Sequence, residues 1–465
     1  MTLEGLRALP ALPGLPLLED TIAAIATAVA PGEGSVAIVR LSGPDAEAIG
    51  RRLFVAPGEQ PWESHRVLYG HVVDPASGER VDEALLLLMK APRSFTREDV
   101  VEFHCHGGLI CVQRVLELVL AAGARRAGAG EFSQRAFLHG RLDLTRAEAV
   151  SELVTARSRR AAQLAMAGLD GGLQRRIGAL RERLLDQLAE LEARVDFEED
   201  LPPLDGQAVA AELRRVTAEL EQLVADGARG QLLRDGLKVA IVGRPNVGKS
   251  SLLNRLSRTE RAIVTDLPGT TRDLVESELV IQGVPLTLLD TAGIRVTDDP
   301  VERLGIERSR AALAAADVVL LLFDLTAGWT EADQELRQLV PSEVPVLVVG
   351  NKADQGALAE PVEADVRISA LSGDGQEHLE RALLECCGCS GNQGLQVALN
   401  RRQRDLAAQA AAALERSQEA AAQQLPWDFW TIDLRAAVRG LGEITGEEVS
   451  EAVLDRVFSR FCIGK

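Results

Sequence analysis

The spacing of apolar residues predicts a first region in which strands and helices are mixed. Short apolar runs bounded by turn residues are typical of buried strands. Four such runs are predicted strands: residues 36–41, 67–73, 84–89 and 100–104. Residues 46–53 and 112–122 instead repeat their apolar positions every three or four residues, which predicts amphipathic helices. The order of these elements indicates an α+β region.

Helical periodicity dominates the next stretch, residues 145–196. Leu180, Leu184 and Leu188 recur on one helical face. The segment Thr145-Arg146-Ala147-Glu148 has the form of a capping box at the start of this stretch. Pro202-Pro203 ends the pattern, and residues 208–228 then form a second predicted helix.

The helical pattern is interrupted and then resumes near the end of the chain, over residues 398–423, 431–441 and 447–459. Each amphipathic helix needs a partner for its apolar stripe, so we expect the two helical segments to pack together as one discontinuous domain. The resulting division predicts five parts: a loose leader at 1–19, an α+β domain at 20–141, helical segments at 142–235 and 386–465, and an inserted domain at 236–385.

The inserted domain begins with a phosphate-binding pattern. Residues 243–250 read Gly-Arg-Pro-Asn-Val-Gly-Lys-Ser, after the apolar run 237–242 and before a helical segment. A loop of this kind between a strand and a helix wraps backbone N–H groups around phosphate oxygens. We expect Lys249 to reach the terminal phosphates and the Ser250 hydroxyl to ligate Mg²⁺.

Three further motifs indicate which nucleotide binds. Asp290-Thr291-Ala292-Gly293 follows the strand-like run 285–289 and suits a contact with Mg²⁺ and the terminal phosphate. Asn351-Lys352-Ala353-Asp354 follows run 344–350, and the Asp354 carboxylate can accept hydrogen bonds from guanine N1 and its 2-amino group. Ser369-Ala370-Leu371 is expected to close over the base, and a threonine of Gly269-Thr270-Thr271 to complete the Mg²⁺ shell.

In this order the motifs resemble those of GTPases, which predicts an inserted P-loop, Ras-like G domain. The predicted GTP-contacting residues are Asn246, Val247, Gly248, Lys249, Ser250, Ser251, Thr265, Asp266, Leu267, Pro268, Gly269, Thr270, Thr271, Asp290, Thr291, Ala292, Gly293, Asn351, Lys352, Asp354, Ser369, Ala370 and Leu371. One departure concerns catalysis: Ile294 stands where Ras-like proteins carry the glutamine that orients the attacking water. The water-orienting group must therefore come from elsewhere. A second departure is Asn246, whose side-chain oxygen could coordinate a cation beside the phosphates.

Composition restricts the classes of protein to which the chain can belong. The chain has 465 residues, enough for about three domains, and a net charge of −18. This charge argues against a protein that coats nucleic acid by bulk attraction, although it allows a local basic patch. The six cysteines do not form a disulfide framework. With no apolar run of about 18 residues and no signal peptide, we expect a cytoplasmic protein without a membrane span.

Several candidate ligands have two interpretations. His104 and His106 could bind a metal, but without an evident third ligand we favour imidazoles that are hydrogen-bonded at a strand end. Cys386, Cys387 and Cys389 are read as reduced thiols rather than a zinc site. The C-terminal Cys462-Ile463-Gly464-Lys465 does not fit a prenylation signal, which leaves either a functional tail or a frayed end.

A family resemblance becomes specific when distant motifs are combined. The segments 20–27, 102–108, 137–144 and 461–465, together with the G-domain motifs, resemble the tRNA modification GTPase family MnmE (also called TrmE). The resemblance implies an N-terminal folate-binding domain, a helical domain of two segments and an inserted G domain. It also implies a homodimer through the N-terminal domains and a partner that contains FAD, MnmG. With MnmG, the family adds a carboxymethylaminomethyl or aminomethyl group to carbon 5 of the wobble uridine of certain tRNAs.

The resemblance also implies roles for individual residues. Arg40, Glu102, Arg141 and Lys465 would contact 5-formyl- or 5,10-methylene-tetrahydrofolate, the one-carbon donor. Arg141 and His139 stand where many relatives have Lys and Asn, so charge is kept at Arg141 but its geometry differs. Cys462 would be a candidate catalytic thiol, and we expect the tail that carries it to reach the folate residues.

For GTP hydrolysis, the resemblance assigns water activation to Glu302. Mg²⁺ would be held by Ser250 and Thr271. K⁺ would replace an arginine finger, and its implied ligands are Asn246, Thr265, Leu267 and Thr270.

Two other functions are alternatives. A GTP-dependent assembly switch without tRNA chemistry would not need the folate motifs. A stand-alone folate-dependent methyltransferase would need a catalytic constellation outside the G domain, and only Cys462 offers one. Because the sequence has no glycine fingerprint for FAD, redox chemistry must lie on a partner.

Overall fold

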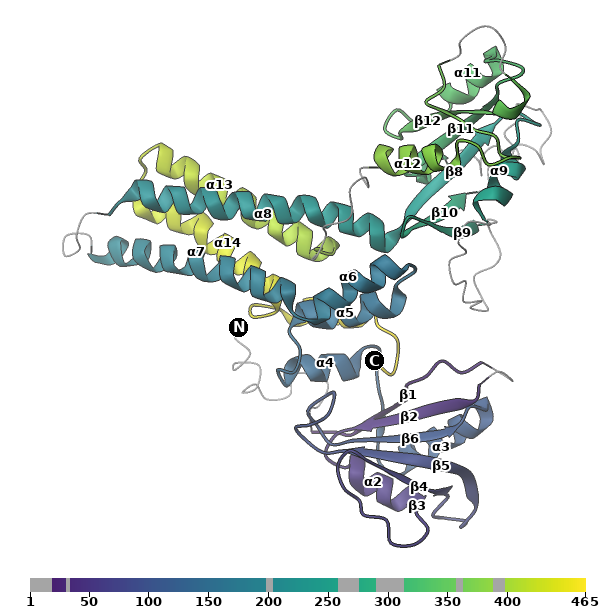
Figure 1. Cartoon of the computed structure of the whole chain (residues 1–465). Coiled ribbons are helices and arrows are strands. Elements are labelled where there is room, and N and C mark those ends of the chain that lie inside the picture. The colour runs from purple at the N-terminus through teal and green to yellow at the C-terminus, as the bar shows by residue number, and fades with distance from the viewer. Residues whose placement is uncertain are drawn as a thin grey trace, which may run out of the picture. The chain divides into compact units, whose positions relative to one another are not determined.

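The computed structural model describes residues 19–30, 34–197, 204–257, 276–289, 313–356, 363–387 and 398–465 (Figure 1). Side chains at 195–197 and 276–277 are not among them. The chain forms two compact units. Unit 1 contains residues 1–151, 174–214 and 412–465, and unit 2 contains 152–173 and 215–411.

Unit 1 contains a seven-stranded sheet, counted over the described residues, in the order β3-β4-β5-β6-β2-β1-β7. Its strands are β1 (Ile22–Ile25), β2 (Val36–Ser42), β3 (Phe54–Val55), β4 (Arg66–Val73), β5 (Arg80–Met89), β6 (Val100–His106) and β7 (Arg125–Arg126). Neighbouring strands are antiparallel except for the β1–β7 pair. The four strands predicted from apolar runs are confirmed, each with slightly different ends.

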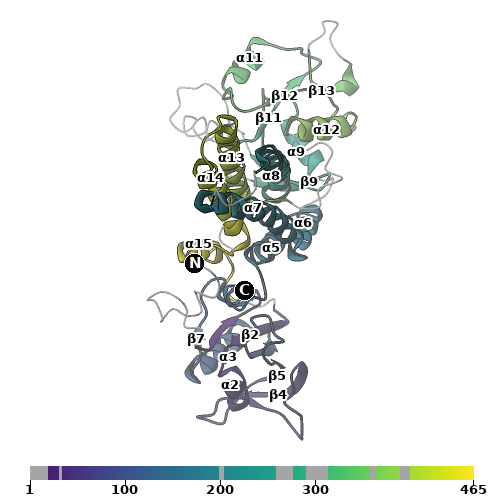
Figure 2. The same ribbon diagram turned by 90° about the vertical axis from the view of Figure 1, so that its left-hand side faces the viewer.

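The two faces of this sheet differ because side chains alternate along each strand. Helices α2 (Ala46–Leu53) and α3 (Leu109–Ala121) pack on one face, where Leu41, Leu86 and Phe103 are buried (Figure 2). Arg40 pairs with Glu102 across β2 and β6, and both are out of phase with those core residues. Arg40 and Glu102 therefore lie on the opposite face of the sheet.

Helix α4 (Glu131–Leu138) connects the sheet to the helical part of unit 1. Its end packs with α5 (Leu144–Thr155), α15 (Glu451–Phe458) and Phe461 in one apolar cluster. The expected capping box at 145–148 is wrong: Asp143 Oδ1 accepts the Arg146 N–H at 3.1 Å, and Thr145 is buried within the first turn. Asp143 lies one residue before the helix, where its carboxylate can satisfy a free N–H of the first turn.

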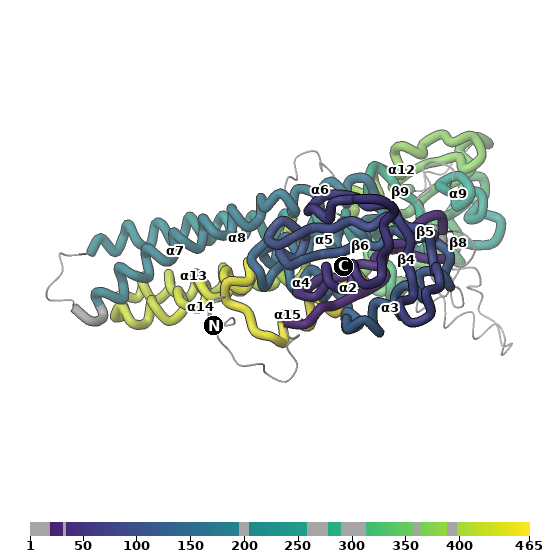
Figure 3. The backbone as a smooth tube through the Cα atoms, turned by 90° about the horizontal axis from the view of Figure 1, so that it is seen from below, coloured from purple at the N-terminus to yellow at the C-terminus, as the bar shows by residue number. Residues whose placement is uncertain are grey.

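The long helical stretch predicted at 145–196 is divided into α5, α6 (Arg159–Leu169) and α7 (Gly172–Phe197). Ser158 caps α6, and Gly171 takes a φ of +74° between α6 and α7. The second segment supplies α13 (Arg401–Ala422) and α14 (Trp427–Thr445), and α8 (Gly206–Asp235) precedes the insert. Arg435 of α14 binds Glu192 of α7 at 2.7 Å, and Figures 1 and 3 show α7 and α14 side by side. The two helical segments are therefore in contact through α7 and α14, while their grouping into one domain stays a prediction.

Unit 2 contains a six-stranded sheet, again within the described residues, in the order β13-β12-β11-β8-β10-β9. The strands are β8 (Leu237–Gly243), β9 (Glu276–Ile281), β10 (Val284–Leu289), β11 (Val318–Asp324), β12 (Val346–Asn351) and β13 (Val366–Arg367). The helices with them are α9 (Lys249–Leu256), α11 (Glu331–Gln338) and α12 (Gln376–Cys386). Pairings are parallel except in the β9–β10 hairpin. This α/β arrangement places binding loops at the carboxyl ends of the parallel strands.

Among the described helices, none combines the length and apolarity required to cross a membrane.

Candidate functional site

The phosphate-binding loop of unit 2 runs from the end of β8 to the start of α9. Gly248 precedes the first residue of α9 and takes a φ of +102°, which only glycine adopts at low cost. Asn246 also has a positive φ, +65°. Asn246 and Ser250 are exposed, so their side-chain oxygens are accessible to a cation. The loop therefore has the backbone geometry expected of an anion-binding helix start.

Asn351 joins three of the predicted motifs. Its Nδ2 donates to the Val247 carbonyl at 2.7 Å, and its Oδ1 accepts the Ala370 N–H at 2.9 Å. A Cβ at Gly248 would lie 2.2 Å from the same Nδ2. The side chain is buried. The phosphate loop, the Asn351–Asp354 motif and the Ser369–Leu371 loop are thus brought to one place.

Two lysines of these motifs are held at their strand ends. Lys249 Nζ donates to the Gly243 and Arg244 carbonyls at 2.6 and 2.9 Å. Lys352 Nζ donates to Asp324 Oδ2 at 2.6 Å. Burial alone would raise the pKa of Asp324, but hydrogen bonds from Lys352 and Thr326 outweigh it and lower the pKa. Asp324 positions Lys352, and the sequence motifs did not predict this role. The sequence feature that could have indicated it is an acidic residue directly after the apolar run 318–323.

The base-binding motif is open to solvent at the residues expected to contact guanine. Asp354 is exposed and Leu371 is 80% exposed, whereas Ser369 is buried. The sequence motifs also did not predict a contact of the phosphate loop: Arg244 Nε binds the fully buried Asp333 at 2.8 Å and connects the loop to α11.

The remaining predicted residues lie outside the described part of the chain: Thr265, Asp266, Leu267, Pro268, Gly269, Thr270, Thr271, Asp290, Thr291, Ala292, Gly293 and Glu302.

A second polar cluster lies on the face of the unit 1 sheet that is opposite α2 and α3. Arg40 Nε donates to Glu102 Oε1 at 2.7 Å, and His104 Nε2 lies 3.2 Å from Glu102 Oε2. Burial would raise the pKa of Glu102, but the His104 hydrogen bond and the charge of Arg40 lower it below its ordinary value. Glu102 is therefore an ionised acceptor at neutral pH.

The C-terminal tail lies against this cluster. Arg40 Nη1 donates to the Gly464 carbonyl at 3.2 Å, across 424 positions of sequence. Ile463 forms a β-bridge with Ala129, and the Gly130 N–H donates to the Cys462 carbonyl at 3.4 Å. Cys462 is exposed and Lys465 is partly buried. The tail is paired with backbone, so its expected position beside Arg40 is confirmed and the frayed-end interpretation is wrong.

Arg141 lies after α4, and its guanidinium carbon is 5.8 Å from the centre of the Phe95 ring. His139 Nδ1 is 2.7 Å from the Thr96 carbonyl oxygen, and this contact holds the turn that carries Arg141.

His104 and His106 have separate acidic partners: His104 contacts Glu102, and His106 contacts Asp82 at 2.7 Å. In the described part of the chain, no group of three His, Cys, Asp or Glu side chains could hold a metal ion.

Two domain models account for this architecture. The GTP-binding protein TrmE N-terminus matches residues 21–141, and the MnmE helical domain matches residues 144–462. Curated tRNA modification GTPases MnmE from Synechococcus sp. strains CC9605 and RCC307 are 71% and 73% identical over 447 and 449 residues. In both cases 96% of this chain and 99% of the relative are covered.

The chain belongs to the MnmE family of tRNA modification GTPases. A solved structure of Aquifex aeolicus Era with bound GDP and AlF4⁻ is 31% identical, covering 38% of this chain and 66% of that chain, with a TM-score of 0.27. Membership in the MnmE family identifies the chain as a GTPase with an N-terminal TrmE domain, a helical domain and a G domain.

Proposed function

We propose that this MnmE-family chain couples K⁺-dependent GTP hydrolysis to modification of the wobble uridine of certain tRNAs. With MnmG, it would add a carboxymethylaminomethyl or aminomethyl group to carbon 5 of that base. The added carbon would come from 5-formyl- or 5,10-methylene-tetrahydrofolate. The observation that carries the proposal is the contact of Arg40 with both Glu102 and the C-terminal tail, because it joins the implied folate residues to Cys462.

The GTP half of the proposal is supported by the phosphate loop. Gly248 has no space for a side chain, and the exposed start of α9 offers N–H groups to phosphate oxygens. Lys249 would leave its carbonyl partners for the terminal phosphates, and Asp354 would accept the two guanine donors. Glu302 would orient the attacking water in place of the glutamine that Ile294 cannot replace.

The chemistry of the donor groups suits two cations. The exposed Ser250 hydroxyl fits Mg²⁺, with Thr271 as the second protein ligand that the family resemblance implies. The exposed Asn246 amide is a neutral oxygen ligand, which fits K⁺ together with the 265–270 loop. When bound, these ions would stabilise the charge that develops on the phosphates during hydrolysis.

The folate half of the proposal is supported by the polar cluster on the sheet face opposite α2 and α3. Glu102 is an ionised acceptor suited to pterin N–H groups, and Arg40, Arg141 and Lys465 are cations suited to the anionic glutamate end of a folate. The exposed thiol of Cys462 is carried by the tail that Arg40 binds. The thiol could therefore act on a folate held by these residues.

The same face supports a homodimer. Val36 (β2), Val67 and Tyr69 (β4) and Leu85 (β5) are large apolar or aromatic side chains that are 44–57% exposed there. Adjacent exposed apolar side chains of this kind often mark protein interfaces. A two-fold contact through this face would bring two copies of the Arg40 cluster into one interface. Because the proposed substrate is tRNA, we place the activity in the cytoplasm.

The test is rescue of a strain that lacks its own MnmE-family gene. Expression of this chain should restore the modified wobble uridine, measured by mass spectrometry of nucleosides from purified tRNA. A GTP-dependent assembly switch without tRNA chemistry would hydrolyse GTP but leave the nucleoside profile of the deletion strain unchanged. Failure of rescue with active GTPase and bound MnmG would therefore overturn the proposal.

A further inference from the structure

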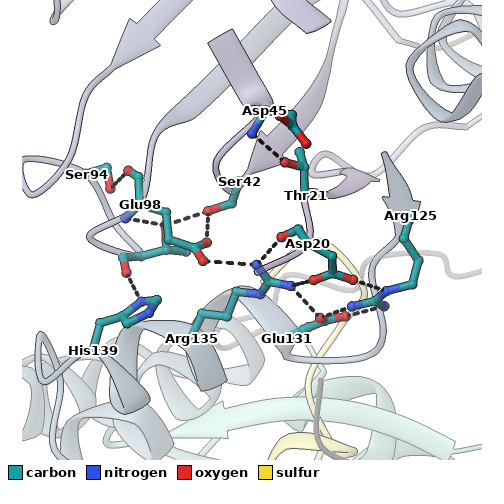
Figure 4. Close-up of polar contacts among 11 residues, drawn as sticks. Asp20, Thr21, Ser42, Asp45, Ser94, Glu98, Arg125, Glu131, Arg135 and His139 are labelled. Atoms are coloured by element: carbon teal, nitrogen blue, oxygen red, sulfur yellow. Dashed lines mark hydrogen bonds and ion pairs between the residues drawn. The ribbon is translucent and has the colours of Figure 1, made fainter. Parts of the chain in front are cut away.

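Arg135 is a fully buried arginine at the centre of an ionic network in unit 1 (Figure 4). Its Nη1 donates to the Asp20 carbonyl at 2.8 Å and to Glu98 Oε1 at 3.0 Å. Its Nη2 donates to Asp20 Oδ1 and to Glu131 Oε1. One side chain on α4 thus holds two other segments of the chain, those of Asp20 and Glu98, and also pairs with Glu131 of its own helix.

One arm of the network reaches the C-terminal tail. Glu131 Oε2 accepts the Gly128 N–H at 2.8 Å, which holds the 128–130 loop against the start of α4. The tail pairs with that loop through Ala129 and Gly130. A Cβ at Gly130 would lie 2.9 Å from the Phe461 Cβ, so the loop and the tail are in close contact. The position of the tail therefore depends on the loop that Glu131 holds.

A second arm reaches the implied folate residues. Glu98 Oε2 accepts the Ser42 hydroxyl at 2.6 Å, and Ser42 lies two positions after Arg40 on β2. Ser42 Oγ is also 2.6 Å from Thr96 Oγ1, and the Thr96 carbonyl holds His139, two positions before Arg141. Figure 4 shows Glu98 between Ser42 and Arg135. Both Arg40 and Arg141 are therefore connected to Arg135 through short hydrogen-bonded paths.

The network requires a complete set of partners. Asp20, Glu98 and Glu131 face Arg135 and Arg125, so one negative charge exceeds the two guanidinium charges. Removing one partner from such a buried network leaves an uncompensated charge. Only a guanidinium offers several N–H donors in a fixed plane, and an ammonium cannot span the same four acceptor atoms.

We propose that Arg135 is a positioning residue that holds the Cys462 tail and the Arg40 and Arg141 segments in one arrangement. The inference rests on the proposed function, since it assigns Arg135 to the tRNA modification that these segments would perform. It acts through Glu131 and Glu98 rather than on the substrate.

The primary variant is Arg135→Lys, which keeps the buried charge and removes the planar fork. Hydrogen–deuterium exchange should accelerate at least about tenfold in peptides covering 126–131 and 459–465, because their mutual hydrogen bonds open more often. The single-turnover rate of wobble-uridine modification at saturating 5-formyltetrahydrofolate should fall at least about tenfold. GTP hydrolysis should stay within about twofold. Arg114→Lys is the matched control because Arg114 binds Asp74 in the same domain, away from the tail, and this variant should change none of these values.

A second variant displaces the tail while leaving the ionic network in place. Gly130→Ala introduces a methyl group at a φ of +64°, against the Phe458 carbonyl of α15 and the Phe461 side chain of the tail. The double variant combines Arg135→Lys with Gly130→Ala. If Arg135 acts by holding the tail, the double variant should modify tRNA no more slowly than the slower of the two single variants. Fully additive losses, or tail exchange unchanged in Arg135→Lys, would overturn the inference. Equally accelerated hydrogen–deuterium exchange across the whole N-terminal sheet would also overturn it, because it would indicate a general loss of stability.

These outcomes differ from failure of the proposed function. If the unaltered chain modifies no tRNA, the proposed function is wrong, while the exchange of the tail still decides whether Arg135 holds it. If the unaltered chain modifies tRNA and the exchange data contradict the inference, only the role of Arg135 is lost.

Discussion

Nucleotide choice is expected to depend on the single carboxylate of Asp354. It is exposed at the end of the Asn351–Asp354 motif, whose first residue is tied to the phosphate loop. Asp354→Asn replaces an acceptor pair with one acceptor and one donor. GTP affinity should fall about 10- to 100-fold, since a charge-assisted pair is lost and a guanine donor faces another donor. Xanthosine triphosphate should gain affinity because it carries a carbonyl at position 2.

The measurement is a titration of both nucleotides against Asp354→Asn and the unaltered chain. Glu377→Gln is a suitable control, since Glu377 lies on α12 and carries a charge outside the base-binding motif. An unchanged GTP affinity in Asp354→Asn would remove the assignment of guanine recognition.

Asn246 is expected to determine the cation dependence of hydrolysis. Its exposed side chain offers one neutral oxygen next to the phosphate loop. Hydrolysis should be faster in KCl than in NaCl at equal ionic strength, because a site of fixed size and oxygen number discriminates between the ions. Asn246→Ala should abolish the difference while nucleotide affinity changes little. Equal rates of the unaltered chain in both salts would contradict the K⁺ proposal.

Two ion-paired acids of unit 1, Asp20 and Glu131, should make its stability sensitive to acid. Burial would raise the pKa values of Asp20 and Glu131, but hydrogen bonds from Arg125, with further contributions from Arg135 and Gly128, lower them from ordinary values of 3.8 and 4.5. A carboxylate whose pKa is lower in the folded than in the unfolded protein stabilises the fold at pH values above its unfolded-state pKa. This contribution is lost as the pH falls through the folded-state pKa. The urea midpoint of unit 1 should therefore be steady near pH 6 and decline below about pH 4.5.

Arg125→Gln tests the cause of this decline. Arg125 binds both Asp20 and Glu131, at 2.6 Å in each case. Its removal should lower the midpoint at pH 6 and make the fall on acidification smaller, because the two pKa values move back toward their ordinary range. An acid decline of unchanged size in the variant would mean that other groups cause it.

At the level of elements, the phosphate loop is expected to tolerate no side chain at Gly248. Gly248→Ala would place a Cβ 2.2 Å from Asn351 Nδ2 at a φ of +102°. The loop must then move or lose its bond to Asn351, and nucleotide affinity should fall at least about tenfold. Binding of a fluorescent GDP analogue measures the loss. Gly356→Ala is the matched control, since Gly356 has a φ of +84° with open space around it and should bind normally. Similar losses in both variants would implicate backbone strain alone.

Elements were predictable where one physical signal dominated. Strands β2, β4, β5, β6, β8, β10 and β12 follow apolar runs, and the phosphate loop follows from glycine spacing between a strand and a helix. Strand β7 was not predicted, because Arg125–Arg126 contains no apolar residue. The break between α5, α6 and α7 was missed because Ala156-Arg157-Ser158 and Asp170-Gly171 are short, and Ala- and Leu-rich flanks keep the helical period. The cap at Asp143 was missed because Thr145 offered an equally good local pattern two positions later.

For the molecule as a whole, we expect the tail to be required for tRNA modification and dispensable for GTP hydrolysis. The tail belongs to unit 1, whereas the phosphate loop belongs to unit 2. Deleting residues 461–465 removes the Gly464 contact with Arg40 and the bridge to Ala129. Modification in the presence of MnmG should fall below detection, with GTP turnover within about twofold of the unaltered chain. A normal modification rate would show that the tail has no functional role.

Cys462→Ser separates two uses of the same tail. If modification is lost while 5-formyltetrahydrofolate still binds, the thiol itself is needed, for chemistry or strict placement. If modification persists, the tail acts through its backbone and Lys465 alone. Rate and folate affinity must therefore be measured on the same preparation.

The sequence by itself determined the family, the fold class and the motifs of the GTP site, because glycine spacing, apolar runs and short polar motifs are local signals. It also supplied the expectation that the tail returns to Arg40, but only through resemblance. The tertiary structure decided which distant groups meet: Arg40 with the Gly464 carbonyl, Asn351 with the Val247 carbonyl, and Arg135 with Asp20 and Glu98. Such pairs depend on strand register and on chain segments far apart in sequence, and no local pattern encodes them.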